Sequence, residues 1–193
     1  MRTLVFATNN AHKAQEVAQI LGPEFQIKTL RDIGCTEDID ETAPDLEGNA
    51  LLKARYVKEK FGLDCFSDDS GLEVSALGGA PGVHTARYAG PGRDAADNNN
   101  FLLKNLEGKS DRSAQFRAVF ALVEADQELL FEGVCKGRIA MAPQGTGGFG
   151  YDPVFIPENY EDTFAILGDD VKNRISHRAI ATEKLRAYLN AKD

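Results

Sequence analysis

Two adjacent carboxylates, Asp68 and Asp69, are the residues of this sequence best suited to catalysis. They lie between the apolar run Cys65-Phe66 and a Ser-Gly step that leads to Leu72. This pattern predicts a strand, an acidic turn and a second strand, with the acidic pair facing solvent. Such a pair could hold a divalent cation through oxygen ligands, or one carboxylate could take a proton from water. A solvated turn is the alternative, and it is the more common role of an Asp-Asp pair.

A polar loop, Thr8-Asn9-Asn10-Ala11-His12-Lys13, follows the apolar run Leu4–Ala7, which predicts a buried strand. The apolar spacing after this loop predicts a helix that stops at Gly22. Outward N–H groups at the helix start, together with Lys13, could bind phosphate oxygens. The alternative is that Asn and Thr side chains cap the helix and Lys13 is solvated.

An acidic stretch that includes Glu41 comes before the next predicted helix. Apolar residues recur there at helical spacing and mark a buried stripe: Leu46, Ala50, Ala54, Val57 and Phe61. Glu41 could join the acidic pair as a further metal ligand, and Lys53, inside the helix, could reach a phosphate. The spacing alone shows neither role, and a solvated loop accounts for most of the acidic stretch.

The glycine-rich segment Gln144–Pro153 formally matches G-x-G-x-x-G, the dinucleotide-binding pattern. That motif requires a helix to open from the glycines, whereas the apolar residues after Pro153 predict a strand. The favoured interpretation is a turn that presents Phe149, Tyr151 and Asp152, so that an aromatic ring can stack on a flat base. The alternative is a glycine-rich loop whose aromatic rings return to the core.

Basic residues gather near the C-terminus: Lys172, His177 and Arg178. Ser176 is a natural N-cap for a final helix, so His177 and Arg178 would project from the first turn. Positive side chains at a helix N-terminus oppose the helix dipole, which suggests that ligand oxygens balance them. A simple surface position is the alternative.

The composition limits the classes of partner. The 193 residues carry a net charge of −8, which argues against broad binding to nucleic acid or an anionic membrane. The three cysteines show no metal-ligand spacing, and no apolar run approaches a membrane span. A reduced, cytoplasmic setting fits these features. Alternation from 113 to 125, followed by a partner strand up to 139, predicts a long hairpin within the sheet.

Seven stretches together resemble the inosine triphosphate pyrophosphatase family, and they occur in that family's order along almost the whole chain. The stretches are Thr8–Lys13, Glu41-Thr42 with Glu47–Arg55, Asp68–Leu72, Gly78–Gly82, Ala86–Tyr88, Gly147–Phe155 and Ser176–Arg178. The sequence departs from the family at His84-Thr85, where many members carry a Ser, although Thr85 keeps the hydroxyl group.

The resemblance implies a mixed α/β fold, elongated and two-lobed, around a long central sheet flanked by helices. It implies a single domain over 1–193 that forms a homodimer. The implied activity is Mg²⁺-dependent hydrolysis of the deaminated purine nucleotides ITP, dITP and XTP to the monophosphate and pyrophosphate. Neither a nucleic acid nor a membrane is an expected partner.

The resemblance also implies roles for individual residues. Asp69 would accept the proton, and Glu41, Asp69 and Asp68 would hold the metal. The residues expected to bind substrate are Thr8, Asn9, Asn10, Ala11, His12, Lys13, Lys53, Ser70, Phe149, Gly150, Tyr151, Asp152, Lys172, His177 and Arg178.

Two rival hypotheses remain open at this point. One is an enzyme of the Maf-like group, which attacks other modified nucleotides. The other is a non-catalytic nucleotide sensor that uses the same pocket without releasing pyrophosphate.

Overall fold

The computed structural model describes residues 1–192; Asp193, the last residue of the predicted domain, lies outside the described residues. Six strands form one sheet in the order β2-β1-β3-β4-β5-β6. The strands are β1 (Arg2–Phe6), β2 (Phe25–Lys28), β3 (Cys65–Val74), β4 (Ser113–Glu124), β5 (Gln127–Ile139) and β6 (Phe155–Pro157). The helices are α1 (Ala11–Leu21), α2 (Leu46–Phe61), α3 (Ala95–Asn105), α4 (Phe164–Leu167), α5 (Asp169–Ile175) and α6 (His177–Asn190). The predicted mixed α/β class is confirmed.

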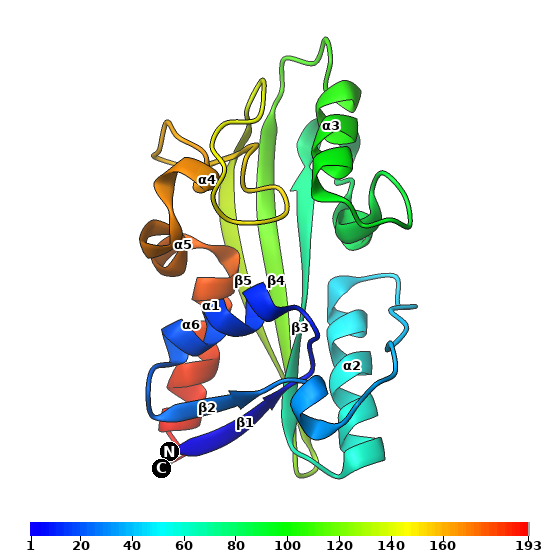
Figure 1. Cartoon of the computed structure of the whole chain (residues 1–193), viewed down its shortest axis with the longest axis vertical. Coiled ribbons are helices and arrows are strands. Elements are labelled where there is room, and N and C mark those ends of the chain that lie inside the picture. Colours follow the sequence, from blue (N-terminus) through cyan, green and yellow to red (C-terminus); the bar gives the residue numbers. More distant parts are fainter. Residues whose placement is uncertain (193) are drawn as a thin grey trace. The chain divides into compact units, whose positions relative to one another are not determined.

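The chain divides into two compact units. Unit 1 comprises Met1–Asp69, Ala118–Gly133 and Arg178–Asp193, and unit 2 comprises Ser70–Arg117 and Val134–His177. Strands β3, β4 and β5, which can be followed in Figure 1, contribute residues to both units. The boundary in β3 falls directly after the acidic pair, so Asp68 and Asp69 both belong to unit 1.

Parallel pairing of β1 with both β2 and β3 organises unit 1. Phe6 lies opposite Phe66, and the two rings stack with centroids 4.5 Å apart. Helices α1 and α6 add their apolar residues to this core, which is built from Leu4, Phe6, Val17, Leu21, Phe25, Phe66, Ala118, Phe120, Leu122, Ala181, Leu185 and Leu189. The parallel register brings the loop after β1 beside the acidic part of β3, because Ala7 N–H donates to the carbonyl of Phe66 at 2.8 Å.

A second core lies in unit 2 and joins α3, the middle strands and the segment around α4. The rings of Phe116 and Phe155 pack together in this core, with centroids 4.5 Å apart. The short strand β6 pairs antiparallel with β5, and Gly137 lies opposite Pro157. A Cβ atom at Gly137 would overlap the carbonyl of Ile156, so this close strand approach requires glycine.

The predicted acidic turn is wrong. Strand β3 runs without interruption from Cys65 to Val74, and Asp68 and Asp69 are only 1% and 7% exposed. A strand can bury two neighbouring carboxylates only if charged partners meet both of them. Lys13 of α1 and Lys53 of α2 are the partners here. The local sequence around the two carboxylates does not predict these partners.

Most other local expectations are confirmed. Helix α1 ends at Gly22, α2 carries the predicted apolar stripe, and β4 and β5 are long neighbouring strands joined at Ala125-Asp126. None of the described helices combines the length and the hydrophobicity that a membrane span requires.

Candidate functional site

The loop after β1 forms the helix start that the sequence predicts. The side chain of Asn10 caps α1 by accepting from the N–H groups of His12 and Lys13 at 3.0 and 3.2 Å. The Asn10 N–H in turn donates to the hydroxyl of Thr8 at 3.0 Å. Thr8 is buried, Lys13 is half-buried, and Asn9, Asn10, Ala11 and His12 are exposed. The loop therefore presents polar groups to solvent, and hydrogen bonds from its side chains hold its own backbone in place.

Asp68 faces the cations of α1 and α6. Lys13 Nζ lies 3.0 Å from one of its oxygens, and Arg178 Nε lies 3.7 Å from the same oxygen. Burial opposes ionisation of this carboxyl, but Lys13, Arg178 and Lys53 outweigh it and hold the pKa of Asp68 well below its usual range. Arg178 also donates to Glu16 at 2.5 Å. Asp68 is thus a permanent anion that anchors two cations.

Asp69 faces the opposite side of β3, because successive side chains of a strand alternate. Its neighbour is Lys53 of α2, whose Nζ lies 3.8 Å from Asp69 Oδ1 and 2.8 Å from Glu41. Burial raises the pKa of Asp69 to about 6, although Lys53 opposes this shift; the negative charge of Glu41 adds to it. The second oxygen, Oδ2, is buried and has no hydrogen-bond donor among the described residues. Asp69 is therefore able to accept a proton near neutral pH.

Glu41 depends on an anchored loop. The backbone N–H of Ala43 donates to the side chain of Asn49 at 2.8 Å, and Asn49 is only 2% exposed. Asn49 precedes Lys53 by one helical turn, so one face of α2 supplies both the loop anchor and the cation. The sequence analysis gave Asn49 no role. A buried Asn one turn before a buried Lys is the signal that could have found it.

The arrangement of the carboxylates matches the predicted metal site only in part. Within residues 1–192, no group of three or more His, Cys, Asp or Glu side chains is arranged to hold a metal ion. Glu41 and Asp69 nevertheless approach one positive centre, Lys53 Nζ, and Asp69 keeps one oxygen without a donor. Mg²⁺ commonly binds one or two carboxylates and takes its other ligands from substrate phosphates and water. The donor set fits Mg²⁺ on that basis, and it favours Glu41 and Asp69 over Asp68.

Unit 2 holds the predicted aromatic surface. Phe149 is partly exposed, and Lys172 Nζ lies 4.2 Å from the centroid of its ring. Asp152 accepts from Lys172 at 2.7 Å and from the N–H of Phe149 at 2.9 Å. We call Phe149, Asp152 and Lys172 the aromatic shelf. The Tyr151 side chain is not presented with Phe149 but packs into the core of unit 2, and Gly150 between them has a φ of +60°.

His177 and Arg178 are adjacent in sequence but have different neighbours. His177 is buried in unit 2, where its ring stacks on Phe116 with centroids 4.7 Å apart. Arg178 is buried in unit 1 with Glu16 and Asp68. Ser176 is buried as well, and Ser70 is half-buried directly after Asp69. Both residues lie in the first turn of α6 as predicted, but both are buried, so the alternative of a simple surface position is wrong. Their roles toward a ligand stay predictions.

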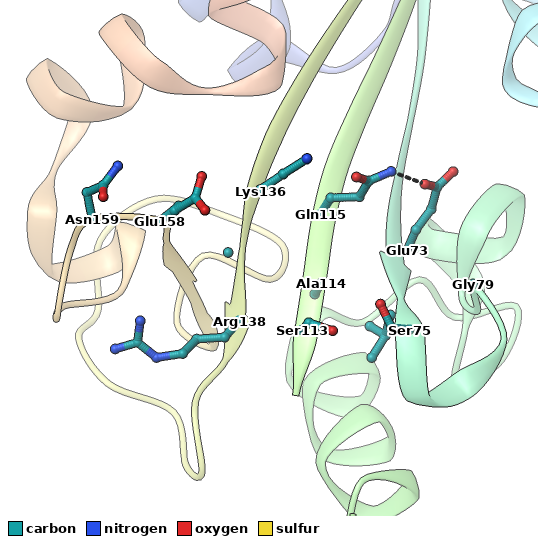
Figure 2. Close-up of a pocket in the computed structure, with 12 residues that line it drawn as sticks. Glu73, Ser75, Gly79, Ser113, Ala114, Gln115, Lys136, Arg138, Glu158 and Asn159 are labelled. Atoms are coloured by element: carbon teal, nitrogen blue, oxygen red, sulfur yellow. Dashed lines mark hydrogen bonds between the residues drawn. The ribbon is translucent and has the colours of Figure 1, made fainter. Parts of the chain in front are cut away.

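A cavity of about 570 Å³ lies elsewhere in unit 2 (Figure 2). Its lining includes Glu73, which accepts from Gln115 at 2.7 Å, and Lys136, Arg138 and Glu158. Two carboxylates and two cations line it together, so its charge does not select a ligand of either sign. None of the predicted site residues lines this cavity.

Gly148 is expected to be intolerant of any side chain. Its φ is +70°, and a Cβ atom there would overlap Asp152 Oδ2 in the aromatic shelf. Gly148→Ala should therefore lower the thermal midpoint more than Gly78→Ala, because Gly78 has a similar φ of +65° but open space around it. The added overlap is worth about 1–3 kcal/mol beyond the strain that both variants share. Differential scanning calorimetry measures the two midpoints, and equal decreases would contradict this account of Gly148.

Comparisons with known proteins agree over nearly the full chain. A model of the Ham1 family matches residues 4–188. A dITP/XTP pyrophosphatase of Porphyromonas gingivalis is 52% identical over 190 residues, which cover 98% of each protein. A dITP/XTP pyrophosphatase of Flavobacterium johnsoniae is 51% identical over 188 residues, covering 97% of this chain and 98% of the relative. The solved Ham1 protein of Staphylococcus aureus has a TM-score of 0.91 at 35% identity and covers 100% of both chains.

Proposed function

Because the chain belongs to the Ham1 family, we propose that it is a nucleoside triphosphate pyrophosphatase that hydrolyses non-canonical purine nucleotides. The substrates are ITP, dITP and XTP, and the products are the monophosphate and pyrophosphate. Two curated relatives that match almost the whole chain bear the name dITP/XTP pyrophosphatase. The observation that carries the chemistry is Asp69, a buried carboxylate with one oxygen lacking a donor and a pKa raised to about 6.

Asp69 acts as the proton acceptor. A water molecule adds to the α-phosphorus, its proton passes to Asp69, and the bond to the pyrophosphate leaving group breaks. Lys53, beside Asp69, and Lys13, on the loop after β1, neutralise negative charge on the triphosphate. The residues from Thr8 to Lys13 bind the phosphate oxygens, and Ser70 contacts the substrate next to the proton acceptor.

Mg²⁺ is the proposed metal, with Glu41 and Asp69 as its protein ligands. When bound, it supplies positive charge to phosphate oxygens. Asp68 was a further candidate ligand. Its close approach by Lys13 and Arg178 supports a different task, which is to hold these two cations in place.

Base recognition in this proposal combines the aromatic shelf with the basic residues near the C-terminus. Phe149 stacks on the purine, and Gly150, Tyr151 and Asp152 form the segment beside it. Lys172, His177 and Arg178 read the edge of the base. Inosine and xanthosine carry a carbonyl acceptor at position six, whereas adenosine carries an amino donor, so protein N–H donors favour the former. The partial exposure of Phe149 and the contact of its ring with Lys172 support this assignment.

The remaining proposals concern organisation. We infer that residues 1–193 work as one domain, that the protein is a homodimer, and that it acts in the cytoplasm on a small nucleotide rather than on nucleic acid. The net charge of −8 supports the absence of a nucleic-acid partner. The three cysteines are free and buried, which suits a reducing compartment.

One assay tests the function directly. The protein and Mg²⁺ are incubated separately with ITP, XTP, dITP, GTP and ATP. The amounts of pyrophosphate and of orthophosphate released are then measured. We expect pyrophosphate from the first three, with much lower kcat/KM for ATP. Guanosine also carries the carbonyl at position six, so any discrimination against GTP must act at position two. Preference for modified pyrimidines in an extended panel would instead support the Maf-like hypothesis. Tight binding of ITP without pyrophosphate release would support the sensor.

Mg²⁺ should raise the thermal midpoint of the metal-free protein, and the increase should be larger at pH 7.5 than at pH 5. The sign follows from Asp69, whose pKa is raised to about 6. Below that pH the group holds a proton, which competes with the cation; above it the carboxylate is free to bind. The measurement is the midpoint with EDTA and with Mg²⁺ at both pH values. An equal Mg²⁺ effect at the two values would remove Asp69 from the ligand set.

A further inference from the structure

Helix α3 buries two adjacent asparagines, Asn98 and Asn99, which are 4% and 5% exposed. Buried amides are costly unless they are hydrogen-bonded, so both side chains are expected to hold neighbouring backbone in place. Both belong to unit 2, as do the residues to which their side chains hydrogen-bond. The mechanism proposed above uses neither residue.

The two side chains hold different segments. Asn98 accepts from the N–H of Ala89 at 2.7 Å and donates to the carbonyl of Ala86 at 3.0 Å. These two bonds secure the turn after the 3-10 helix Gly82–Arg87. Asn99 makes one bond, from its Nδ2 to the carbonyl of Gly150 at 3.1 Å. The side chain of Asn99 therefore reaches the segment that carries the aromatic shelf.

The backbone of that segment can rotate most easily at Gly150. It lies between Phe149 and Tyr151 and has a φ of +60°, a conformation that glycine adopts easily but also leaves easily. The two flanking residues are held, because the Phe149 N–H donates to Asp152 and the Tyr151 hydroxyl donates to the carbonyl of Thr85. The bond from Asn99 fixes the carbonyl between these two points and so restricts rotation of the backbone next to the Phe149 ring.

We propose that Asn99 is a positioning residue for substrate recognition, which holds the Gly150 carbonyl and thereby sets the orientation of the Phe149 ring for stacking on the nucleobase. The inference rests on the proposed function. Asn99 does not touch the phosphates in this account, so its loss should affect binding of the base and leave the binding of a bare triphosphate unchanged.

Asn99→Leu, with Asn98→Leu as the matched control, tests this proposal. Leucine has nearly the shape of asparagine but makes no hydrogen bonds. Asn98→Leu removes two hydrogen bonds and Asn99→Leu removes one, because Asn99 Oδ1 has no donor within the described part of the chain. A purely structural role for both residues thus predicts the larger loss of stability and of activity for Asn98→Leu.

We expect Asn99→Leu to change mainly the KM for ITP and Asn98→Leu to change mainly the thermal midpoint. Asn99→Leu should raise KM for ITP by about 5- to 30-fold, with kcat within about twofold. Its inhibition constant for inorganic tripolyphosphate, measured against ITP, should stay unchanged. Asn98→Leu should show the lower thermal midpoint but the smaller change in KM. A KM effect of Asn98→Leu that equals or exceeds that of Asn99→Leu would overturn the proposal, as would a parallel rise in the tripolyphosphate constant.

A readout without catalysis completes the test. The chain contains no tryptophan, so Phe149→Trp places a unique fluorophore on the shelf. In this background, Asn99→Leu should lower the fluorescence anisotropy of Trp at position 149, and Asn98→Leu should not; equal values for all three proteins would refute the positioning role. If Asn99→Leu does not fold, Asn99→Ser, which keeps a short donor, takes its place. A wild-type protein that fails to release pyrophosphate would refute the proposed function, while the anisotropy comparison would still decide whether Asn99 holds the ring.

Discussion

Replacing Asp69 by Asn is expected to lower kcat for ITP by about 10²- to 10⁴-fold. The amide keeps the shape of the side chain but cannot accept a proton from water. Binding should be largely retained, because Glu41 and the amide oxygen at position 69 can still hold the metal, Lys53 and the loop after β1 are unchanged, and Asp68 still holds Lys13 at 3.0 Å. Steady-state kinetics with ITP and Mg²⁺ give kcat, and calorimetric titration with ITP gives the affinity.

The chain offers a matched control for this variant. Asp64 lies shortly before β3, is exposed, and binds Lys58 at 2.5 Å. Asp64→Asn makes the same chemical change in the same unit and should leave kcat within about twofold, because exposed ion pairs contribute little. Near-normal turnover by Asp69→Asn would show that another group takes the proton.

Arg178→Met is expected to destabilise the protein by about 3–5 kcal/mol. The reason is that two buried carboxylates, Glu16 and Asp68, lose the cation that Arg178 supplies. Arg178 is 3% exposed, donates to Glu16 at 2.5 Å and lies 3.7 Å from Asp68. Without it, the carboxylate of Glu16, itself only 9% exposed, loses this cation. For a chain of this length, such a loss lowers the thermal midpoint by roughly 6–20 °C, which calorimetry measures directly.

Arg186→Met is the control on the same helix. Arg186 pairs with Glu24 at 3.3 Å on the surface, and its side chain is 35% exposed, so its loss should cost less than about 1 kcal/mol. Adding Glu16→Gln to Arg178→Met should restore part of the lost stability, because it removes the buried carboxylate that Arg178 contacted. No recovery in the double variant would show that the destabilisation has another origin.

The same variant tests the base-reading role of Arg178. If Arg178 reads position six of the purine, the ratio of kcat/KM for ITP over ATP should fall in Arg178→Met. An unchanged ratio, measured at a temperature well below the midpoint of the variant, would restrict Arg178 to anchoring Asp68 and Glu16. Kinetics and calorimetry on one preparation therefore separate the structural role from the recognition role.

Local sequence patterns were sufficient to predict the individual helices and strands and the types of residue in the candidate site. Apolar spacing identified helices α1 and α2, and Pro153 with the apolar residues after it ruled out a dinucleotide fingerprint before β6. These features depend on neighbours in the chain, so periodicity and turn residues are sufficient to predict them. The seven stretches that resemble a known family contain all the candidate residues except Lys172, from Thr8 near one end to Arg178 near the other.

The contacts of those residues depend on the tertiary fold. Asp68 and Asp69 look equivalent in sequence, but a continuous strand turns them to opposite faces, where α1 and α6 supply the partners of one and α2 supplies the partner of the other. Their pKa values shift in opposite directions as a result. Two further contacts also depend on the tertiary fold. Arg178 is buried against Glu16, which is 162 positions away, and Asn99 donates a hydrogen bond to the carbonyl of Gly150. Long-range contacts set burial and charge, and no local pattern encodes them.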